Sequence, residues 1–498
     1  MAANAPITSR ESDYSQWYLD IIREAQLADY SPVKGSMVFR PHGFAIWEAM
    51  KSDLDQRFKA TGHVNAYFPL FIPLSFLSKE AEHVEGFAKE CAVVTHHRLT
   101  ECELPNGKKG VKPDPAAKLE EPLIVRPTSE TIIWHMYGQW IQSYRDLPIL
   151  INQWANVVRW ELKTRPFLRT AEFLWQEGHT AHATAEEAQA ETLQMLNVYK
   201  DFAAETLAIP VVTGVKSSSE RFAGAVDTYT IEAMMQNTWA LQAGTSHFLG
   251  QNFAKAFDVT FQTEDGSRSL VWATSWGVST RLVGAAIMTH SDDNGLVLPP
   301  AIAPIQVAVV PIFRKAHEKE VVQPFAENIV AELKAAGFRV VLDDREKMKP
   351  GAKYYDWERK GVPLRLEIGP RDVSNGSAFA ARRIGGKKFG ISAEGIADAV
   401  KDVLDGIQAE LLANALERRV ANTYTCDNYA EFKSRLSADG GWYLVPWTDN
   451  AENEAAIKTE TKATIRCYPL DAQENLDGQK CFYSGEAATH FALFARAY

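Results

Sequence analysis

The stretch VVRWELKTRPFLRTAEFLWQEGHT, residues 157–180, decides the fold. The residues that lead into Arg159 are apolar and β-prone, and side chains two positions apart on a strand share a face. We therefore expect Arg159 and Glu161 to project together from one strand. The return strand should present four alternate side chains on one face: Phe173, Trp175, Glu177 and His179. The stretch thus predicts a charged hairpin within a sheet.

The charges of this hairpin predict a binding pocket. Such charges are more commonly part of a solvated strand face with an incidental ion pair. Here they alternate with Trp160 and Leu174, so both faces should be covered and the charged face should line a pocket. The connection KTRPFL, residues 163–168, is basic, and converging guanidinium groups suit phosphates and carboxylates. We expect a nucleotide and a small charged substrate to meet here.

Composition restricts the class of protein. The chain has 498 residues and is 46% apolar, which is typical of a soluble protein with two or three domains. No apolar run approaches the roughly 18 residues that a membrane helix needs. A formal charge of −10 argues against non-specific coating of nucleic acid, although not against a local basic face that binds a folded RNA. The five scattered cysteines should be reduced, and the N-terminus resembles no targeting segment, so we expect a cytoplasmic protein.

Proline residues divide the chain. The run LPPAIAP, residues 298–304, cannot continue a helix or a central strand and is the clearest linker. After it, alternating strands and helices predict a compact α/β domain. The charged residues 100–120 should form an exposed loop, and Thr128 or Ser129 should cap the next helix. Before the linker we expect helices at 13–28, 43–60 and 184–207 and strands at 67–73, 122–126 and 226–235.

Three segments together resemble the motifs of the class II aminoacyl-tRNA synthetases. They are a helix and strand at Gly35 to Pro73, an Arg-x-Glu strand with its loop at Arg159 to Phe173, and a glycine-containing strand and helix at Ser275 to Gly284. The closer resemblance is to the prolyl-tRNA synthetase family. Five strings carry it: RPTSET at 126–131, FLRT at 167–170, WQEGH at 175–179, GTSH at 244–247 and KTETKAT at 458–464.

The resemblance implies a fold and a domain order. Residues 1–300 should form an α+β catalytic domain with an antiparallel sheet, 301–410 an α/β anticodon-binding domain, and 411–498 a small α+β C-terminal domain. The interval between the second and third motifs is too short to add an internal editing domain, because a domain needs its own core. The chain therefore resembles the archaeal and eukaryotic type of the family.

The resemblance also implies the chemistry and the residues that perform it. Proline would attack the α-phosphate of ATP, and the prolyl-adenylate would pass its acyl group to tRNA, with positioning and charge stabilisation as the main contributions of the protein. The catalytic residues would be Arg159, Glu161 and Arg281. The ATP site would comprise Arg159, Glu161, Arg169, Thr170, Gln242, Thr245, Ser279 and Arg281. The proline site would comprise Thr128, Glu130, Arg159, Trp175, Glu177, His179, Phe222, His247 and Ser275.

The implied partners are tRNA(Pro), L-proline and ATP with Mg²⁺, and a second copy of the chain bound through Gly35 to Pro73. No membrane partner is expected. Two alternatives remain open. One is a catalytically silent synthetase-like protein that binds tRNA or regulates translation, and the other is an enzyme for another amino acid such as threonine. Positive charge for the anticodon would come from seven residues: Arg345, Lys347, Lys353, Arg365, Arg371, Arg382 and Arg383.

The C-terminal segment departs from the resemblance at a zinc site. Relatives of this type carry four cysteines there, whereas this chain has Thr448, Asn453 and Ser484 at three of the positions and retains Cys481. Tetrahedral zinc needs four Cys, His or carboxylate donors. We therefore expect the domain to contain no structural zinc and to be held together by aromatic packing.

Overall fold

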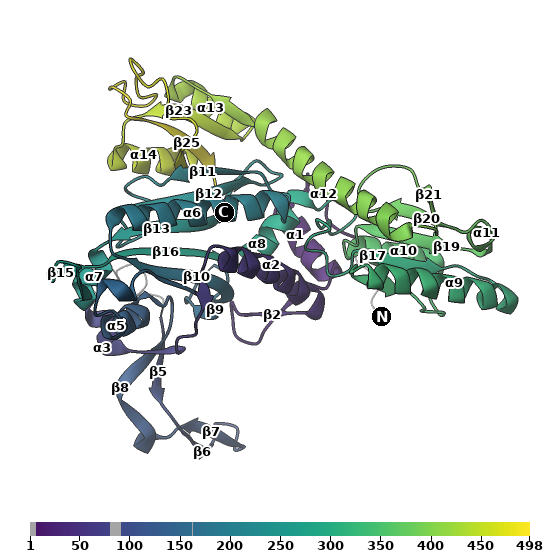
Figure 1. The fold of residues 1–498 in the computed structure, drawn as a ribbon, viewed down its shortest axis with the longest axis horizontal. Coiled ribbons are helices and arrows are strands. Elements are labelled where there is room, and N and C mark those ends of the chain that lie inside the picture. The colour runs from purple at the N-terminus through teal and green to yellow at the C-terminus, as the bar shows by residue number, and fades with distance from the viewer. Residues whose placement is uncertain (1–5, 80–90, 162) are drawn as a thin grey trace.

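A computed structural model describes residues 6–79, 91–161 and 163–498. Within this part of the chain, the largest sheet has eleven strands, and it confirms the antiparallel sheet expected for the catalytic domain (Figure 1). Its pairs from β24 to β9 are all antiparallel, and β22–β23 and β9–β3 are parallel. In spatial order the strands are β22 (Thr423–Thr425), β23 (Trp442–Trp447), β25 (His490–Arg496), β24 (Ala463–Pro469), β11 (Val211–Val215), β12 (Asp227–Met234), β13 (Ala240–Gly250), β16 (Trp272–Ser279), β10 (Glu172–His182), β9 (Ile149–Val158) and β3 (Val64–Asn65).

Helices cover one face of strands β10, β12, β13 and β16 and leave a pocket on the other. The apolar face of these helices and the even-numbered side chains of β16, Trp276 and Val278, share one buried core. Gly178 of β10 lies directly under Trp276, where an added Cβ would come within 2.1 Å of the indole ring. The main helices of this layer are α1 (Tyr14–Glu24), α2 (Pro41–Ala60), α6 (Ala185–Glu205) and α8 (Arg281–His290).

The ends of these helices follow from local sequence. Pro41 occupies the first turn of α2, where its missing N–H costs nothing. Thr184 caps α6 by accepting a hydrogen bond from the backbone N–H of Glu187 at 3.2 Å, and the acidic first turn complements the helix dipole. Two further helices, α5 (Glu130–Trp140) and α7 (Asn252–Phe257), pack at the far edge of the catalytic region.

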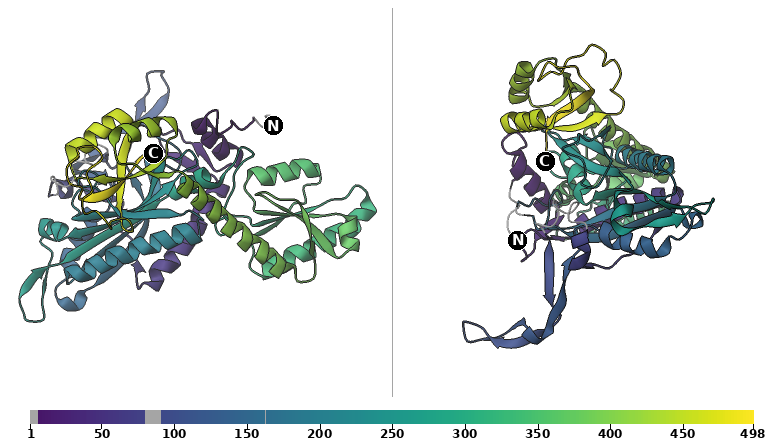
Figure 2. Two further views of the ribbon diagram at one scale, coloured as in Figure 1. Left: turned by 90° about the horizontal axis from the view of Figure 1, so that it is seen from above. Right: turned by 90° about the vertical axis from the view of Figure 1, so that its left-hand side faces the viewer.

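Residues beyond the proline-rich linker form a separate five-stranded sheet with helices, as the alternating pattern predicts. Seen from above, this region stands to one side, and the long helix α12 (Ile396–Ala421) runs from it to the rest of the molecule (Figure 2). In spatial order its strands are β18 (Val340–Leu342), β17 (Val307–Pro311), β19 (Leu364–Ile368), β20 (Ser377–Arg382) and β21 (Phe389–Ser392). Its other helices are α9 (Ala316–Ala335), α10 (Pro350–Arg359) and α11 (Pro370–Ser374).

The C-terminal segment continues the eleven-stranded sheet. Strand β24 pairs with β11 through Tyr468 opposite Val215 and Pro469 opposite Gly214. The four C-terminal strands and the helices α13 (Tyr429–Ala438) and α14 (Ala451–Thr461) pack around an aromatic core that contains Trp447, Phe482 and Phe494. The C-terminal unit is thus joined to strand β11 of the same sheet by backbone hydrogen bonds.

In two regions the structure departs from the elements expected from the sequence. Residues 100–120 are no simple loop: β6 (Leu99–Glu103) and β7 (Lys109–Pro113) form a hairpin that projects from the body beside β5 (Ala92–His96) and β8 (Lys118–Val125) (Figure 1). Both faces of this hairpin meet solvent, so its sequence lacks the apolar alternation that indicates a strand. Arg159 and Glu161 also do not lie on a strand, because β9 ends at Val158.

The remaining elements flank these regions. The helix expected at 13–28 ends at Glu24.

No helix among residues 6–79, 91–161 and 163–498 is long and apolar enough to cross a bilayer. The short elements are β1 (Ala28–Tyr30), β2 (Met37–Phe39), β4 (Phe71–Pro73), α3 (Leu74–Lys79), β14 (Thr260–Gln262) and β15 (Arg268–Leu270).

Candidate active site

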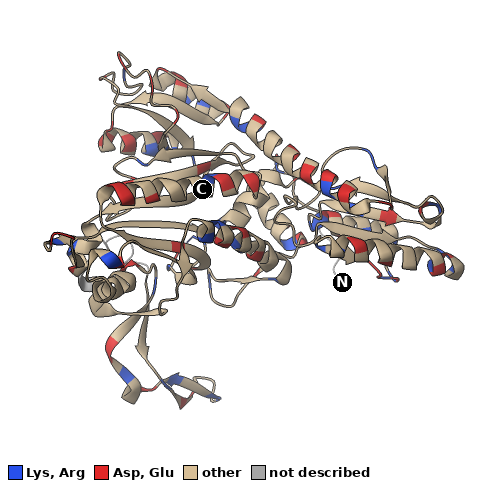
Figure 3. Cartoon of the chain, viewed as in Figure 1, with Lys and Arg blue, Asp and Glu red and all other residues tan. Residues whose placement is uncertain are grey.

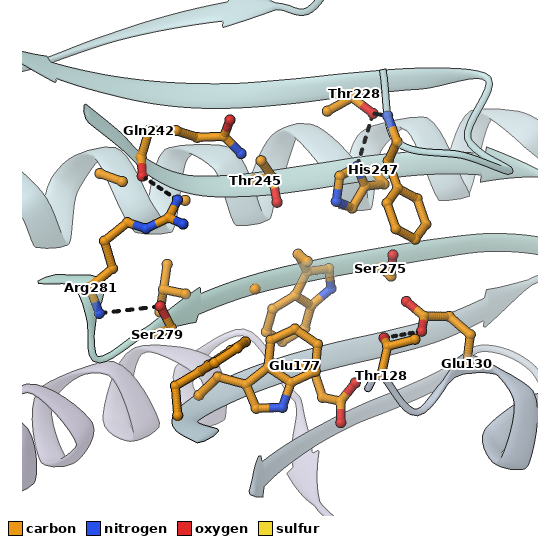
Figure 4. Close-up of a pocket in the computed structure, with 18 of the residues that line it drawn as sticks. Thr128, Glu130, Glu177, Thr228, Gln242, Thr245, His247, Ser275, Ser279 and Arg281 are labelled. Atoms are coloured by element: carbon orange, nitrogen blue, oxygen red, sulfur yellow. Dashed lines mark hydrogen bonds between the residues drawn. The ribbon is translucent and has the colours of Figure 1, made fainter. Parts of the chain in front are cut away.

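A cavity of about 280 Å³ lies on the open face of β10, β12, β13 and β16 (Figure 4). Its lining is chemically polarised. Arg281 and Gln242 lie at one end, and Thr128, Glu130 and His247 lie at the other. The lining includes these residues from the predicted sites: Thr128, Glu130, Arg159, Trp175, Glu177, His179, Phe222, Gln242, Thr245, His247, Ser275, Ser279 and Arg281.

Strand periodicity brings most of these side chains together. The expected face of β10 is confirmed, because Phe173, Trp175, Glu177 and His179 all line the cavity. On β13 the periodicity is interrupted. Ile231 pairs with Gly244 and Glu232 with Gln242, so the pairing skips Ala243 and forms a β-bulge. A bulge changes the direction of the side chains beside it, which explains why both Gln242 and Thr245 line the cavity.

A buried carboxylate lies at the start of α5. Glu130 is the first residue of the helix, where the helix dipole favours a negative charge, and it accepts a hydrogen bond from the Thr128 hydroxyl. Glu130 is only 5% exposed and takes part in none of the ion pairs formed by the described residues. This carboxylate can therefore receive a ligand cation.

The expected helix cap has a different function. Ser129 occupies the cap position of α5, but its hydroxyl donates to Glu177 instead of capping the helix. The Glu177 carboxylate also accepts from the Gln153 amide at 2.8 Å and lies 2.9 Å from Nε2 of His179. Burial alone raises the pKa of Glu177, but the hydrogen bond and charge of His179 outweigh it and lower the pKa. Glu177 thus holds the side chains of Ser129, Gln153 and His179 in place beside the cavity.

His179 and His247 have opposite protonation preferences. Burial lowers the pKa of His179, but the bond to Glu177 and the charge of Glu130 raise it above its usual value. Burial and the nearby His179 lower the pKa of His247 to about 3, so His247 is neutral at physiological pH. Nδ1 of His247 lies 3.0 Å from the Thr228 hydroxyl, and its ring lies 4.6 Å from that of Phe222. Together they form an apolar wall with one fixed imidazole.

Two arginines also line the cavity. Nε of Arg159 donates to the Pro127 carbonyl at 3.0 Å, and its guanidinium carbon lies 5.5 Å from the centre of the Trp175 ring. Arg281 donates from Nε to the Leu168 carbonyl and from Nη1 to the Gln242 carbonyl, both at 3.2 Å. Burial and the charge of Arg159 lower the pKa of Arg281 to about 10, so two cations are held close together at the site. An anion would relieve their repulsion.

Three predicted residues lie outside the cavity lining. Glu161 and Arg169 form an ion pair with each other at 2.7 Å, and the Thr170 hydroxyl donates to the Glu172 carbonyl at 2.6 Å. All three belong to the connection after β9, where the expected strand parity does not hold. In this structure they lie next to the cavity without lining it.

Among the cavity-lining residues with a hydroxyl or carboxyl side chain, sequence reasoning missed Thr228 and Glu220. Thr228 stands directly opposite His247 on the neighbouring strand, so the strand predicted at 226–235 and its pairing could have revealed it. Ser275 was predicted, and its buried hydroxyl has no hydrogen-bond partner within the described residues. Such a buried polar atom is a candidate contact for a ligand.

The side chains at the C-terminal positions compared above with a zinc site do not fit a zinc ion. Cys481 is buried, but the Thr448 hydroxyl donates to the Ala487 carbonyl at 2.7 Å and the Ser484 hydroxyl to Glu486 at 3.2 Å. These hydrogen bonds and the turn from Cys481 to Gly485 hold the segment together. Within the described residues, no group of three or more His, Cys, Asp or Glu side chains could hold a metal ion. The absence of zinc stays a prediction.

Sequence comparisons assign this fold and cavity to a class. Residues 114–290 match the family model described as "tRNA synthetase class II core domain (G, H, P, S and T)", and residues 306–403 match "Anticodon binding domain". A core of this class combined with that second domain defines a class II aminoacyl-tRNA synthetase. Residues 429–498 match a third model, "Prolyl-tRNA synthetase, C-terminal".

Whole-chain relatives specify the family. Proteins named "Proline--tRNA ligase" from Porphyromonas gingivalis and Parabacteroides distasonis are each 59% identical to this chain over 492 residues, which covers 99% of either chain. One from Cytophaga hutchinsonii is 56% identical over the same length and coverage. The chain belongs to the prolyl-tRNA synthetase family, as the motifs predict.

Proposed function

We propose that this protein ligates L-proline to tRNA(Pro) by way of a prolyl-adenylate, with release of AMP and pyrophosphate. One observation carries the proposal: a single cavity is lined by a buried carboxylate and two arginines, with Glu130 at one end and Arg281 at the other. Proline is a zwitterion with an apolar ring. Its ammonium group suits Glu130, its carboxylate suits Arg159, and its ring suits the wall formed by Phe222, His247 and Trp175.

The same geometry supports activation of the carboxylate. Arg159 would bridge the proline carboxylate and the α-phosphate of ATP, and Arg281 would hold the terminal phosphates. Bringing two anions together is the main barrier, so fixed cations in a site shielded from water stabilise the transition state. Gln242, Thr245 and Ser279 complete the ATP site within the cavity. Glu161, Arg169 and Thr170 would contact the nucleotide from the adjacent connection.

Mg²⁺ would enter with the nucleotide. This ion keeps several waters and is usually held by one or two carboxylates together with substrate phosphates. Among the described residues that line the cavity, Glu130, Glu177 and Glu220 are the carboxylates. Glu130 and Glu177 are at the proline end, so the phosphates of ATP would provide most of the ligands to the ion.

The tRNA would extend from the cavity to the five-stranded region. We propose the divisions 1–300, 301–410 and 411–498 for catalysis, anticodon binding and the C-terminal unit. Basic and acidic segments alternate along α12, so this helix offers no continuous basic face (Figure 3). Lys353 and Arg383 are buried, and Arg383 binds Asp292 at 2.6 and 2.8 Å, whereas Lys347 and Arg371 are exposed and available to RNA.

A homodimer and a cytoplasmic location complete the proposal. Exposed apolar side chains gather in and beside the first motif, namely Tyr30, Val38, Phe44, Val64, Tyr67, Phe71 and Leu74. A groove beside them is lined by Phe44, Trp47 and Trp154. Large exposed apolar patches mark interaction sites, and a second copy would bury this one. Sedimentation velocity should show a dimer that Phe71→Glu weakens.

ATP–pyrophosphate exchange with a panel of amino acids tests the function. We expect exchange to be strongest with proline. Weaker exchange with alanine and cysteine is expected, since one methylene in an apolar pocket is worth about 1–3 kcal/mol. A stronger response to threonine or another amino acid would overturn the substrate assignment. No exchange with any amino acid, with tRNA binding retained, would favour a silent tRNA-binding protein.

A further inference from the structure

Three charged side chains form a buried cluster outside the cavity. Nε and Nη2 of Arg466 each donate to Oε2 of Glu232 at 3.0 Å. Lys216 donates from Nζ to Oε1 of the same carboxylate at 3.3 Å and to the Arg466 carbonyl at 2.9 Å. The Thr230 hydroxyl donates to Oε1 at 3.0 Å. The side chains of Lys216 and Glu232 are at most 2% exposed, and that of Arg466 is 9% exposed.

The cluster joins two parts of the chain that are far apart in sequence. Lys216 and Glu232 belong to the catalytic region, whereas Arg466 lies on β24 of the C-terminal unit. Arg466 is the residue that the pairing of β24 with β25 skips, between Ile465 and Cys467. A bulge at this position turns its side chain toward the catalytic strands. A C-terminal side chain is thus held by a carboxylate of the active-site sheet.

Glu232 occupies a critical position on that sheet. It pairs with Gln242 at the β-bulge that brings both Gln242 and Thr245 to the cavity. The carbonyl of Gln242 accepts the hydrogen bond from Nη1 of Arg281 at 3.2 Å. A continuous series of contacts therefore leads from Arg466 through Glu232 and Gln242 to Arg281. The charges of Glu232 and Arg466 are also close enough to affect the pKa of Arg281.

The net charge of the cluster favours binding of an anion nearby. Two cations and one carboxylate leave a net positive charge in a region shielded from water. Replacing buried ion pairs by apolar side chains commonly costs no stability, so packing alone does not require these charges. Beside Arg281, the surplus positive charge would favour the phosphates of ATP.

We propose that Arg466 is a positioning residue for the ATP site. Through Glu232 it fixes the β-bulge that directs Gln242 into the cavity and holds the Gln242 carbonyl against Arg281. The C-terminal unit thereby contributes to nucleotide binding without touching the nucleotide. Because this role of Arg466 concerns the binding of ATP, it rests on the proposed function.

Steady-state exchange kinetics of Arg466→Met test this role. We expect the KM for ATP to rise roughly tenfold, as for residues coupled through direct contacts, while the KM for proline changes less than about twofold. Arg496→Met is the matched control, because Arg496 lies on the neighbouring β25 and, within the described residues, its side chain donates only to the Thr461 carbonyl of its own unit. Its two KM values should equal those of the wild type.

Arg466→Lys keeps the positive charge but loses the bidentate contact with Glu232. This variant tests the role of Arg466 if Arg466→Met does not fold. Its KM for ATP should rise less than that of Arg466→Met while the KM for proline stays constant. Equal changes in both KM values, or no change in the KM for ATP, would overturn the role of Arg466. Wild-type protein that shows no proline-dependent exchange would instead refute the proposed function, so the two failures are distinguishable.

Discussion

Glu130→Gln removes one negative charge from the proline end of the cavity and keeps the shape of the side chain. The wild-type carboxylate is buried, accepts the Thr128 hydroxyl and lies near the start of α5. The amide oxygen of glutamine can accept the same hydroxyl, so the local geometry should persist. The variant also no longer carries a buried charge, so the midpoint of thermal unfolding should not fall.

The magnitude follows from the type of hydrogen bond that is lost. A hydrogen bond to a charged group contributes about 1.5–3 kcal/mol, compared with about 1 kcal/mol for a neutral one. The difference between the two is about 0.5–2 kcal/mol, which corresponds to roughly 2- to 30-fold weaker binding of proline. In ATP–pyrophosphate exchange, the KM for proline should rise by that factor while the KM for ATP stays within about twofold.

An uncharged analogue separates the charge from the shape. Tetrahydrofuran-2-carboxylate has an ether oxygen where proline has its ammonium group. It should inhibit the wild type weakly, and Glu130→Gln should reduce the difference in affinity between proline and this analogue. An unchanged KM for proline, or an equal loss of affinity for both compounds, would refute the pairing of Glu130 with the ammonium group.

Three further predictions concern other parts of the molecule. Arg159→Ala should lower the exchange rate by at least about 100-fold, as for other losses of transition-state charge stabilisation, with an unchanged unfolding midpoint; substantial exchange would contradict its role. The pKa of His247 is lowered to about 3 in the folded protein, so the unfolded chain binds more protons between about pH 3 and 6.5. The free energy of unfolding should therefore be fully retained above pH 6.5. As the pH falls below 6.5, it should decrease by up to about 1.4 kcal/mol per pH unit. Urea titrations should show a smaller decrease for His247→Asn. Metal analysis of the purified protein should find no stoichiometric zinc, and treatment with a chelator should leave the unfolding midpoint unchanged; a bound zinc ion would refute this prediction.

Local sequence patterns predict much of the fold. Strand alternation identified the face of β10 that carries Trp175, Glu177 and His179, and the proline-rich linker marked the start of the five-stranded region. The motif resemblance identified Gln242 and Arg281, which the structure brings to the same end of one cavity. These successes share a cause, because periodicity and motifs are properties of short segments.

The errors arise where distant strands or irregular backbone decide the geometry. Strand parity failed for Glu161 because β9 ends three residues earlier, at Val158. The bulge that brings Gln242 to the cavity depends on the pairing of β13 with β12, and no pattern within either strand specifies it. The pairing of β11 with β24 is even less accessible, since it joins residues about 250 positions apart.

That pairing affects how the chain must be made. Strand β11 ends at Val215, and its partner β24 begins at Ala463. At about 5–20 residues per second, a ribosome needs roughly 12–50 s to make the intervening segment. During this time one edge of the half-built sheet has no partner from its own chain, and an open edge readily pairs with other chains. Newly made protein should therefore be most prone to aggregation late in translation, and chaperones that bind nascent chains should matter most in that interval.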